Sequence, residues 1–315
     1  MTRLLPLLLI ATPAAFAQTA PSAYIPTSLQ AEPDLPRTPG GHPDFQAVTW
    51  ATNFFPVFEA TPMAATLIVS EAEAKTFVDT MVKGILSNPA LAIDPEGEII
   101  IGDTDGLPLV RGERRSRLVV LPANGKVPLT PEAKTIANTS SDEMDDYEQR
   151  PSGERCLVLS GAPPHFVTVS YNRLQFIQTP DHVVIHGENG DEARIIPFAA
   201  SHGPINTASW YGDSIARWEG DTLVVETIRQ RQSEAVRGLF QKFLVNADAK
   251  VIERFTRLSK SELLYQFTVE DPKVYTAPWL AEYSFFASDT GMFPSPCHEH
   301  NYSLPNILLG QRMAD

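Results

Sequence analysis

Residues 251–269, VIERFTRLSKSELLYQFTV, decide the fold of this chain. Val251–Leu258 and Leu263–Val269 are two strand-like runs, and the short polar turn Ser259-Lys260-Ser261 separates them. Successive side chains of a strand point to opposite faces, so a strand shows a period of two. The second run has this period, with one face formed by Leu263, Tyr265, Phe267 and Val269. The stretch therefore predicts an antiparallel β-hairpin.

Further strand pairs extend this pattern towards the N-terminus. Ile215–Glu219 and Leu223–Thr227 flank a tight turn at Gly220-Asp221, and short apolar runs precede them at residues 174–178, 183–185 and 194–196. Short strands joined by tight turns build an antiparallel meander, which hides its edges most simply by closing on itself. Strands do not alternate with helices, and 27 prolines argue against a helical bundle. We predict an all-β fold with minor α content, an antiparallel meander closing into a barrel or barrel-like sheet.

One amphipathic segment, Ser70–Leu86, is predicted to be a helix that covers this sheet. Ser70 and Glu73 have the spacing of a capping box, and Asn88-Pro89 ends the helix. Its apolar side chains recur at helical spacing, at Ala74, Phe77, Val78, Met81, Val82 and Ile85. Residues 131–147 and 233–245 are predicted to contain further helical pieces.

The N-terminus has the pattern of an export signal. Arg3 precedes a short apolar run, and Ala15-Phe16-Ala17 forms a small-x-small cleavage site. The run is too short to cross about 30 Å of hydrocarbon, and no later stretch approaches eighteen apolar residues, so we expect no membrane insertion after cleavage. We predict a signal peptide at 1–17, an extended lead-in at 18–49 and a single β-rich domain at 50–315. The predicted location is periplasmic or secreted.

Charge and missing motifs exclude several classes of partner. The formal net charge is −13 without a basic cluster, so we expect no nucleic acid partner, because such binding needs clustered lysine and arginine. The chain has no Gly-x-Ser-x-Gly elbow, phosphate-binding glycine loop, dinucleotide fingerprint or His-Glu-x-x-His pair. We therefore expect no cofactor.

The two cysteines, Cys156 and Cys297, are predicted to form a disulfide. In an oxidising compartment two cysteines of one folded chain usually pair. Two alternatives remain at this point, namely two separate buried thiols, or a nucleophilic Cys297 beside His298.

The densest polar cluster follows the second cysteine, at residues 297–302. On an extended segment His298 and His300 point to the same side, so the pair can share a transition metal or supply a general base. A lone His-x-His is a weak metal signal, and a polar C-terminal segment without chemistry is the simpler interpretation. We expect no metal, and we retain His298 and Glu299 as catalytic candidates.

Two other sets of polar residues are candidates for a site. The first is the stretch 209–221, in which Trp210, Asp213, Arg217 and Trp218 can line a binding mouth, with His202 just upstream. For Asp221 turn chemistry is the favoured interpretation, and for Asp213 the turn and the site are equal alternatives. The second set lies in the hairpin of residues 251–270. If Glu253, Tyr265 and Glu270 face a barrel interior, they form a polar floor; if they face solvent, they form cross-strand ion pairs.

Long stretches of this chain resemble a widespread family of exported bacterial proteins of unknown function. The residues that carry the resemblance include His42-Pro43-Asp44, Arg217–Thr227 (RWEGDTLVVET), Glu253–Arg257 (ERFTR), Phe267–Pro272 (FTVEDP) and Cys297-His298-Glu299. The resemblance covers most of Pro36–Gly310 and implies secretion and a β-rich body, but no activity. His300 departs from the family pattern, where glycine is usual, which weakens a two-histidine metal site.

Three functional hypotheses follow. In the first and preferred one, the sheet binds a small apolar or aromatic ligand, and Trp210, Trp218, Tyr265 and Trp279 provide apolar walls. In the second, the protein is a hydrolase, isomerase or lyase with His298 as acid or base, Glu299 or Asp213 orienting it and Arg217 stabilising an anion. In the third it is a structural envelope protein without a cavity. Convergence of His298, His202 and a carboxylate in one cleft would favour the enzyme.

Overall fold

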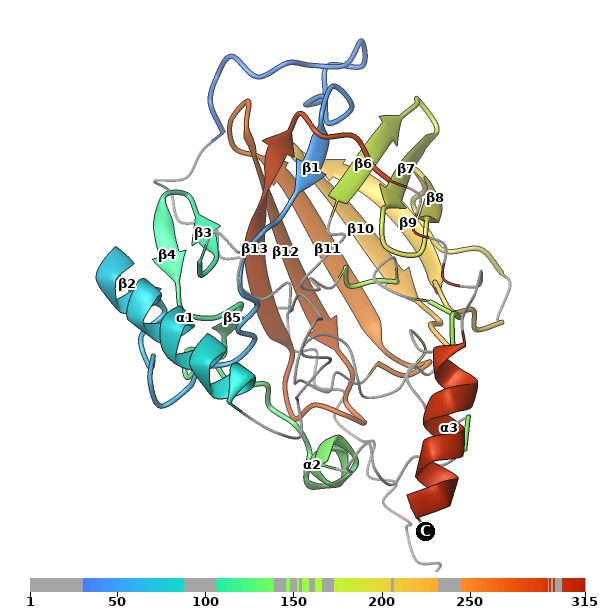
Figure 1. The fold of residues 1–315 in the computed structure, drawn as a ribbon. Helices are drawn as coiled ribbons and strands as arrows, with labels where there is room; N and C mark the ends of the chain where they lie inside the picture. The colour runs from blue at the N-terminus through green and yellow to red at the C-terminus, as the bar shows by residue number, and fades with distance from the viewer. Residues whose placement is uncertain are drawn as a thin grey trace, which may run out of the picture.

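The computed structural model describes residues 31–87, 106–138, 146–147, 152, 155–158, 162–165, 173–204, 207–231, 245–293, 295, 297 and 302–314. Its main feature is a ten-stranded antiparallel sheet (Figure 1). The strand order is β8 (Glu192–Pro197), β7 (His182–Gly187), β6 (Arg173–Gln178), β1 (Thr49–Ala51), β13 (Trp279–Ser288), β12 (Glu262–Glu270), β11 (Lys250–Arg257), β10 (Thr222–Ile228) and β9 (Asp213–Glu219), and β5 (Val119–Leu121) pairs with β13 outside this path.

A smaller sheet and three helices accompany the large sheet in the described part of the chain. The small sheet has the order β2 (Ile68–Val69), β4 (Glu113–Arg115), β3 (Leu109–Val110). The helices are α1 (Glu71–Leu86), α2 (Pro131–Asn138) and α3 (Ser303–Ala314). In Figure 1, α1 lies beside the small sheet and α3 lies at the opposite side of the large sheet.

The hairpin predicted at residues 251–269 is confirmed as β11 and β12. Phe255 pairs with Tyr265 and Glu253 pairs with Phe267, so the inward side chains of the two strands share one face. The predicted strand pair around Gly220-Asp221 is β9 and β10, and the three apolar runs before it are β6, β7 and β8. The antiparallel, β-rich fold is therefore confirmed.

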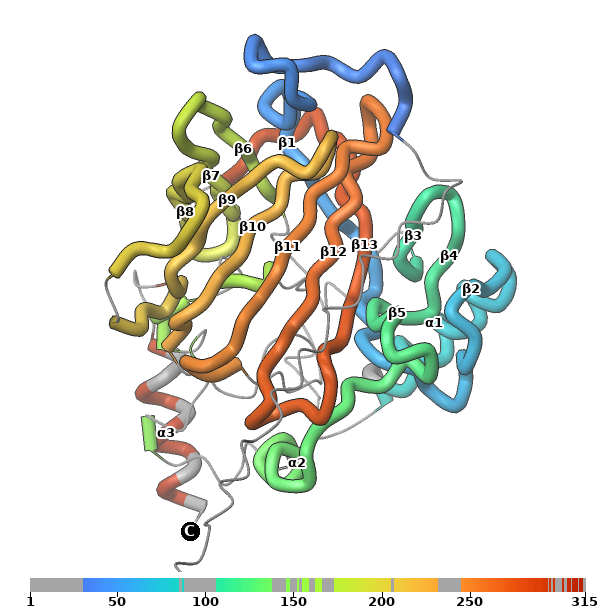
Figure 2. The backbone as a smooth tube through the Cα atoms, turned by 180° about the vertical axis from the view of Figure 1, so that it is seen from behind, coloured from blue at the N-terminus to red at the C-terminus, as the bar shows by residue number. Residues whose placement is uncertain are grey.

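The sheet curls until its two edge strands lie next to each other (Figures 1 and 2). Phe198, which directly follows β8, forms a single parallel bridge with Ala216 of β9, and the Ala199 N–H donates to the Ala216 carbonyl over 3.3 Å. The described residues of β8 and β9 form no continuous ladder. Because a closed barrel needs such a ladder, the observed shape is a strongly curled sheet with a seam between β8 and β9.

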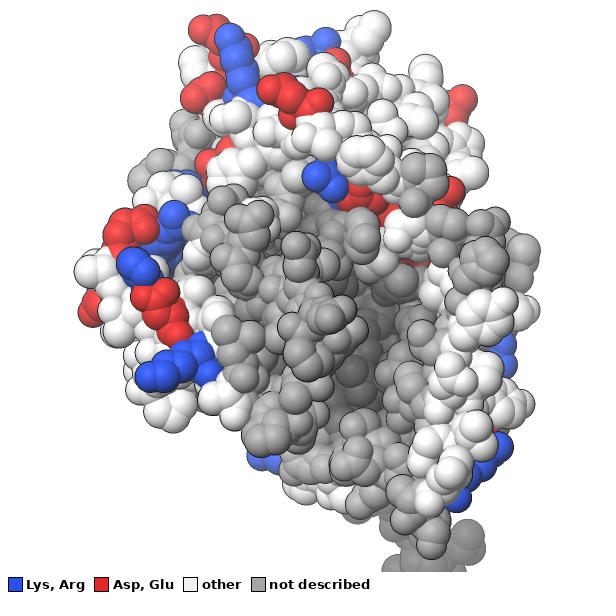
Figure 3. Space-filling view, viewed as in Figure 1, with Lys and Arg blue, Asp and Glu red and all other residues white. Residues whose placement is uncertain are grey.

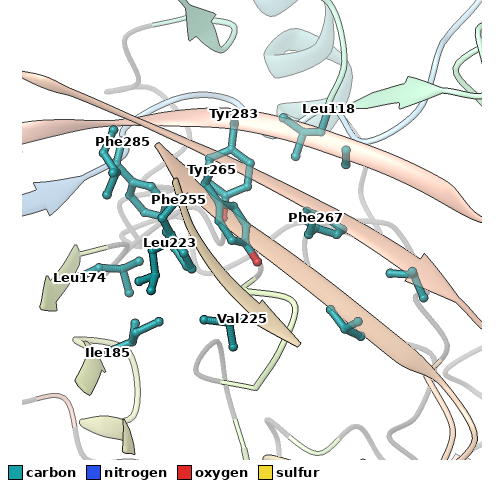
Figure 4. Packing of buried hydrophobic residues seen from close by; sticks show 14 of the residues in the cluster. Leu118, Leu174, Ile185, Leu223, Val225, Phe255, Tyr265, Phe267, Tyr283 and Phe285 are labelled. Carbon is teal, nitrogen blue, oxygen red and sulfur yellow. The ribbon is translucent and has the colours of Figure 1, made fainter. Parts of the chain in front are cut away.

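The main hydrophobic core fills the concave side of the sheet. Figure 4 shows Phe255, Tyr265, Tyr283 and Phe285 gathered on this side, facing Leu174 and Ile185 from the strands across the interior. All of these side chains are buried. The curl thus buries the apolar faces of β6–β8 against those of β10–β13, which is the main stabilisation available to a sheet of this kind.

The predicted helix at Ser70–Leu86 is confirmed, but it does not cover the large sheet as expected. Its capping box is formed, with the Ser70 N–H donating to Glu73 Oε2 at 2.8 Å and the Glu73 N–H to Ser70 Oγ at 3.3 Å. The two fully buried side chains described for α1, Ala74 and Phe77, pack in a separate core with Phe55, Val57, Ala64 and Leu107. This narrow apolar stripe suits a small satellite core better than a broad sheet.

The other local predictions have mixed outcomes. Of the helical piece predicted at 131–147, the structure describes α2 (Pro131–Asn138), and most of the remainder lies outside the described residues. Most of the helical piece predicted at 233–245 also lies outside the described residues. Cys156 and Cys297 form the predicted disulfide, with their Cα atoms 5.4 Å apart. Among the described helices, none has the length and apolar character needed to cross a membrane.

Candidate functional site

A pocket of about 760 Å³ opens where the seam between β8 and β9 reaches the end of the curled sheet. Four segments line it: residues 38–40 with His42 of the lead-in, 178–180 after β6, 198–200 after β8 and 216–218 of β9. We call it the mouth pocket. Its volume is in the range of small-molecule sites, which are usually concave and mostly apolar.

Aromatic rings form the floor of the mouth pocket. The ring of His42 stacks on the indole of Trp218, with centroids 4.4 Å apart and an angle of 3° between the planes. Phe198 lies on the same indole at 6.4 Å and 23°. Both Phe198 and Trp218 also pack against the main core, which fixes their position. The three rings line the pocket together, and a further flat ring can pack against this cluster through edge or face contacts.

The lead-in supplies one wall of the pocket, a role that the sequence did not indicate. Residues 37–43 form a compact loop, in which the Thr38 N–H donates to the His42 carbonyl at 2.8 Å. Arg37 holds this loop on the β9–β10 turn through two hydrogen bonds of 2.8 Å to the carboxylate of Asp221. The hydrogen bonds and charge of Arg37 lower the pKa of Asp221. Asp221 is thus more than the turn residue that we predicted.

Charged residues lie on the outer side of the pocket. Arg217 donates from Nε and Nη2 to Glu219 Oε1 at 2.9 and 2.8 Å, and Arg254 donates from Nη1 to Glu219 Oε2 at 2.8 Å. Partial burial raises the pKa of Glu219, but the hydrogen bonds from Arg254 and Arg217 bring the net pKa below its usual value. One carboxylate here is shared by two guanidinium groups.

A second polar cluster lies inside the curled sheet, and we call it the interior network. Glu253 accepts hydrogen bonds from Arg194 Nη1 and Nη2 at 3.1 and 2.6 Å and from the Tyr265 hydroxyl at 2.8 Å. The Tyr265 oxygen accepts from the His165 N–H at 2.7 Å. Burial, followed by the charge of Glu253, raises the pKa of Tyr265. Glu253 and Tyr265 thus face the interior, as the polar-floor hypothesis requires.

The third residue of that hypothesis, Glu270, is not part of the interior network. It lies at the end of β12 and forms an ion pair of 2.9 Å with Lys250 of the neighbouring strand. This is the cross-strand pair that the alternative interpretation predicted.

His202 and Asp213, both predicted site residues, come together on the outer face of β9 and β10. His202 Nδ1 lies 3.3 Å from Asp213 Oδ2, and His202 Nε2 lies 3.3 Å from Glu226 Oε1. Arg229 Nη1 donates to Asp213 Oδ2 at 2.7 Å. An imidazole between two carboxylates can hold or transfer a proton, yet none of these residues lines the mouth pocket in the described part of the chain.

The remaining predicted site residues lie apart from the mouth pocket or outside the described residues. Trp210 is under the guanidinium of Arg231, which is 4.9 Å from its ring centroid. Trp279 is fully buried in the core against Phe58 and Phe267. His298 and Glu299 lie outside the described residues, so their convergence with His202 stays a prediction. Within the described part of the chain, no group of three His, Cys, Asp or Glu residues could hold a metal ion.

Several residues of these sites escaped the sequence analysis. Arg194 had a signal, because it shares the two-residue period of β8 with the buried Ile196 and is therefore an inward-facing charge. His42 and Phe198 had none, since each lies in a loop whose partner is far away in the sequence.

Comparison with family models, with curated proteins and with solved structures gives no match to this chain. The function is therefore argued from the site alone.

Proposed function

We propose that this chain is an exported protein that binds a small, flat, apolar or aromatic molecule in the mouth pocket. The observation that carries the proposal is the stack of His42 and Phe198 on Trp218 in an open pocket of about 760 Å³. Aromatic pairs in such geometries contribute about 0.5–1.5 kcal/mol beyond the area they bury. A flat ligand gains this contribution and also removes apolar surface from water.

The proposal includes a barrel-like container and an exported location. We infer that β8 and β9 act together as the closing seam of a barrel, supported by their bridge at Phe198 and Ala216. The signal-peptide pattern at residues 1–17, the Cys156–Cys297 disulfide and the resemblance to exported bacterial proteins support a periplasmic or secreted location. Acidic and basic side chains are interleaved on the described surface seen in Figure 3, a mixture that favours solubility in such a compartment.

A direct test measures binding of a neutral flat probe, 2-naphthamide, to the mature protein by equilibrium dialysis. We expect saturable one-site binding to the wild type and at least roughly tenfold weaker binding to Trp218→Leu, because both the stack and its apolar area are lost. Trp210→Leu is the matched control, since Trp210 is a partly exposed tryptophan outside the pocket.

A second variant guards against a folding defect in Trp218→Leu. Ala200→Phe places a ring at the exposed rim of the pocket and leaves the aromatic floor in place. We expect it to reduce binding through occupied space alone. Equal binding by wild type, Trp218→Leu and Ala200→Phe, or no binding by any of them, would contradict the proposal; the second result is the one that a structural envelope protein predicts.

A further inference from the structure

The mouth pocket has a one-sided charge. Of its described lining residues, only Arg217 has a permanently charged side chain, and none is a carboxylate. This is unusual in a chain whose formal net charge is −13. An arginine beside an apolar, partly enclosed surface attracts anions more strongly than an arginine in bulk water, because the lower local dielectric weakens screening.

The surroundings of Arg217 carry a surplus of positive charge. Val224 of β10 pairs with Arg217 on one side and with Arg254 on the other, so the two arginines extend from the same outer face. Both donate to the single carboxylate of Glu219. The other ion pair at the mouth, Arg37 with Asp221, is one to one. The group of Arg217, Arg254 and Glu219 therefore has a net charge of +1.

Arg217 can turn to a ligand without leaving Glu219 unpaired. Glu219 Oε2 keeps its hydrogen bond of 2.8 Å from Arg254 when Arg217 moves. Arg217 is also the more exposed of the two, with 43% of its side chain accessible against 22% for Arg254. An exposed pair such as Arg217–Glu219 is worth about 0–1 kcal/mol, so a second carboxylate can compete for it.

The positions of Arg217 and Trp218 define the shape of the ligand. Consecutive residues of a strand point to opposite faces, and their Cα atoms are about 3.8 Å apart. Since β9 is an edge strand and both residues line the pocket, the pocket passes around the strand edge. A single small molecule can thus reach the aromatic cluster with a ring and the guanidinium with a substituent.

We infer that the mouth pocket selects flat aromatic molecules that carry a carboxylate, with the ligand ring packing against the cluster of His42, Phe198 and Trp218 and Arg217 binding the carboxylate. The inference rests on the proposed function and adds the ligand class. No covalent step is involved. Guanidinium and carboxylate form charge-assisted, often bidentate hydrogen bonds, which are about twice as strong as neutral ones.

The test compares 2-naphthoate with 2-naphthamide, two probes of nearly equal shape that differ in charge. By equilibrium dialysis at low ionic strength, we expect the wild type to bind 2-naphthoate at least roughly fivefold more tightly, as a charge-assisted hydrogen bond provides. Arg217→Gln should abolish this preference, and Arg217→Lys should keep part of it. Lys260→Gln is the matched control, because it removes one positive charge from the exposed turn between β11 and β12, at the same end of the sheet, but touches neither Glu219 nor the pocket.

Each outcome has a defined meaning. If wild type binds both probes equally, the preference for anions is wrong, while the proposed binding function stands. If Lys260→Gln loses the preference as fully as Arg217→Gln does, the effect is a general field and direct recognition by Arg217 is wrong. If neither probe binds, the proposed function fails together with this inference.

Discussion

The mouth pocket and the interior network use the same residue types on one sheet, but in opposite ways. In the interior network, Arg194 and Glu253 are 4% and 0% exposed, and Tyr265 adds a further hydrogen bond to the carboxylate. At the mouth, Arg217 and Glu219 are 43% and 41% exposed, and two arginines share one carboxylate. A buried pair that is matched one to one holds strands together. Under the proposed function, the exposed arginine in excess at the mouth is available to a ligand, whereas the buried pair has a structural role.

Removal of Glu253 should cause the largest loss of stability, because it disrupts the interior network. Glu253→Ala leaves the buried charge of Arg194 uncompensated, so we expect a loss of about 3–5 kcal/mol in the free energy of unfolding. Urea unfolding followed by circular dichroism measures it. Glu270→Ala, which breaks the more exposed pair with Lys250, should lose less than about 1 kcal/mol. Similar losses in the two variants would show that the interior network is not structural.

Loss of the disulfide tests whether ligand binding at the mouth pocket is independent of the overall stability of the fold. The double variant Cys156→Ser, Cys297→Ser opens a link between residues 141 positions apart, and we expect a loss of about 2–5 kcal/mol. Reducing agent should destabilise the wild type by the same amount and leave the double variant unchanged. Affinity for 2-naphthamide, measured well below the unfolding transition, should stay within about twofold of wild type. A larger drop would mean that the tethered C-terminal segment shapes the mouth pocket.

Two glycines at the two ends of β9 compare a closely packed position with an open one. Gly212 has a φ of +72°, and a Cβ there would lie 2.6 Å from Thr227 Cγ2 and 2.8 Å from the Ile228 oxygen. Gly220, in the β9–β10 turn near the mouth, has a φ of +59° with open space around it. Gly220→Ala should lose about 1–2 kcal/mol from backbone strain, and Gly212→Ala about 1–3 kcal/mol more from overpacking. Thermal unfolding of both variants provides the measurement, and equal losses would contradict the close packing at Gly212.

The smallest predicted effect is the pH dependence of the stability that Arg37 and Asp221 contribute by holding the loop of residues 37–43. Arg37 lowers the pKa of Asp221 in the folded state, so this pair stabilises the fold above the unfolded pKa of about 3.9 and loses its effect as pH falls through the lower folded value. Arg37→Gln should therefore unfold at a slightly lower urea concentration than wild type at pH 7, and the difference should shrink as the pH falls below about 3.9. Urea midpoints measured in steps from pH 7 to pH 2 test this. A difference that stays constant over this range would assign the effect to packing of the loop rather than to the charge pair.

The fold was largely predictable from the sequence because its hairpins are local. The alternation in residues 251–269 and the turn at Gly220-Asp221 specify strand pairs within a few residues, and both were found as predicted. The seam at Phe198 and Ala216 was less accessible, since a curled sheet and a closed barrel have the same strand pattern.

The site was predictable only in part. The tryptophans interleaved with carboxylates and an arginine in residues 209–221 led to Arg217 and Trp218, which both line the mouth pocket. His42 contacts Trp218 across 176 positions of the chain, as their residue numbers show, and no local pattern reports such a contact. The sequence analysis correctly grouped Glu253 and Tyr265, but it could not tell which face of the sheet they occupy. Their partner in the interior, Arg194, comes from a strand that is distant in the sequence.

The single bridge between β8 and β9 also determines where the curled sheet can widen. Separation of β9 from β10 would break a ladder of seven paired residues, whereas parting at Phe198 and Ala216 removes one backbone hydrogen bond, with a net cost of about 1 kcal/mol. The curled sheet thus has its weakest backbone connection between β8 and β9, next to the aromatic residues of the mouth pocket. Further along, Arg194 of β8 is hydrogen-bonded to Glu253 of β11. For the proposed aromatic carboxylates, widening of this gap would admit rings of different thickness while Arg217 still binds the carboxylate.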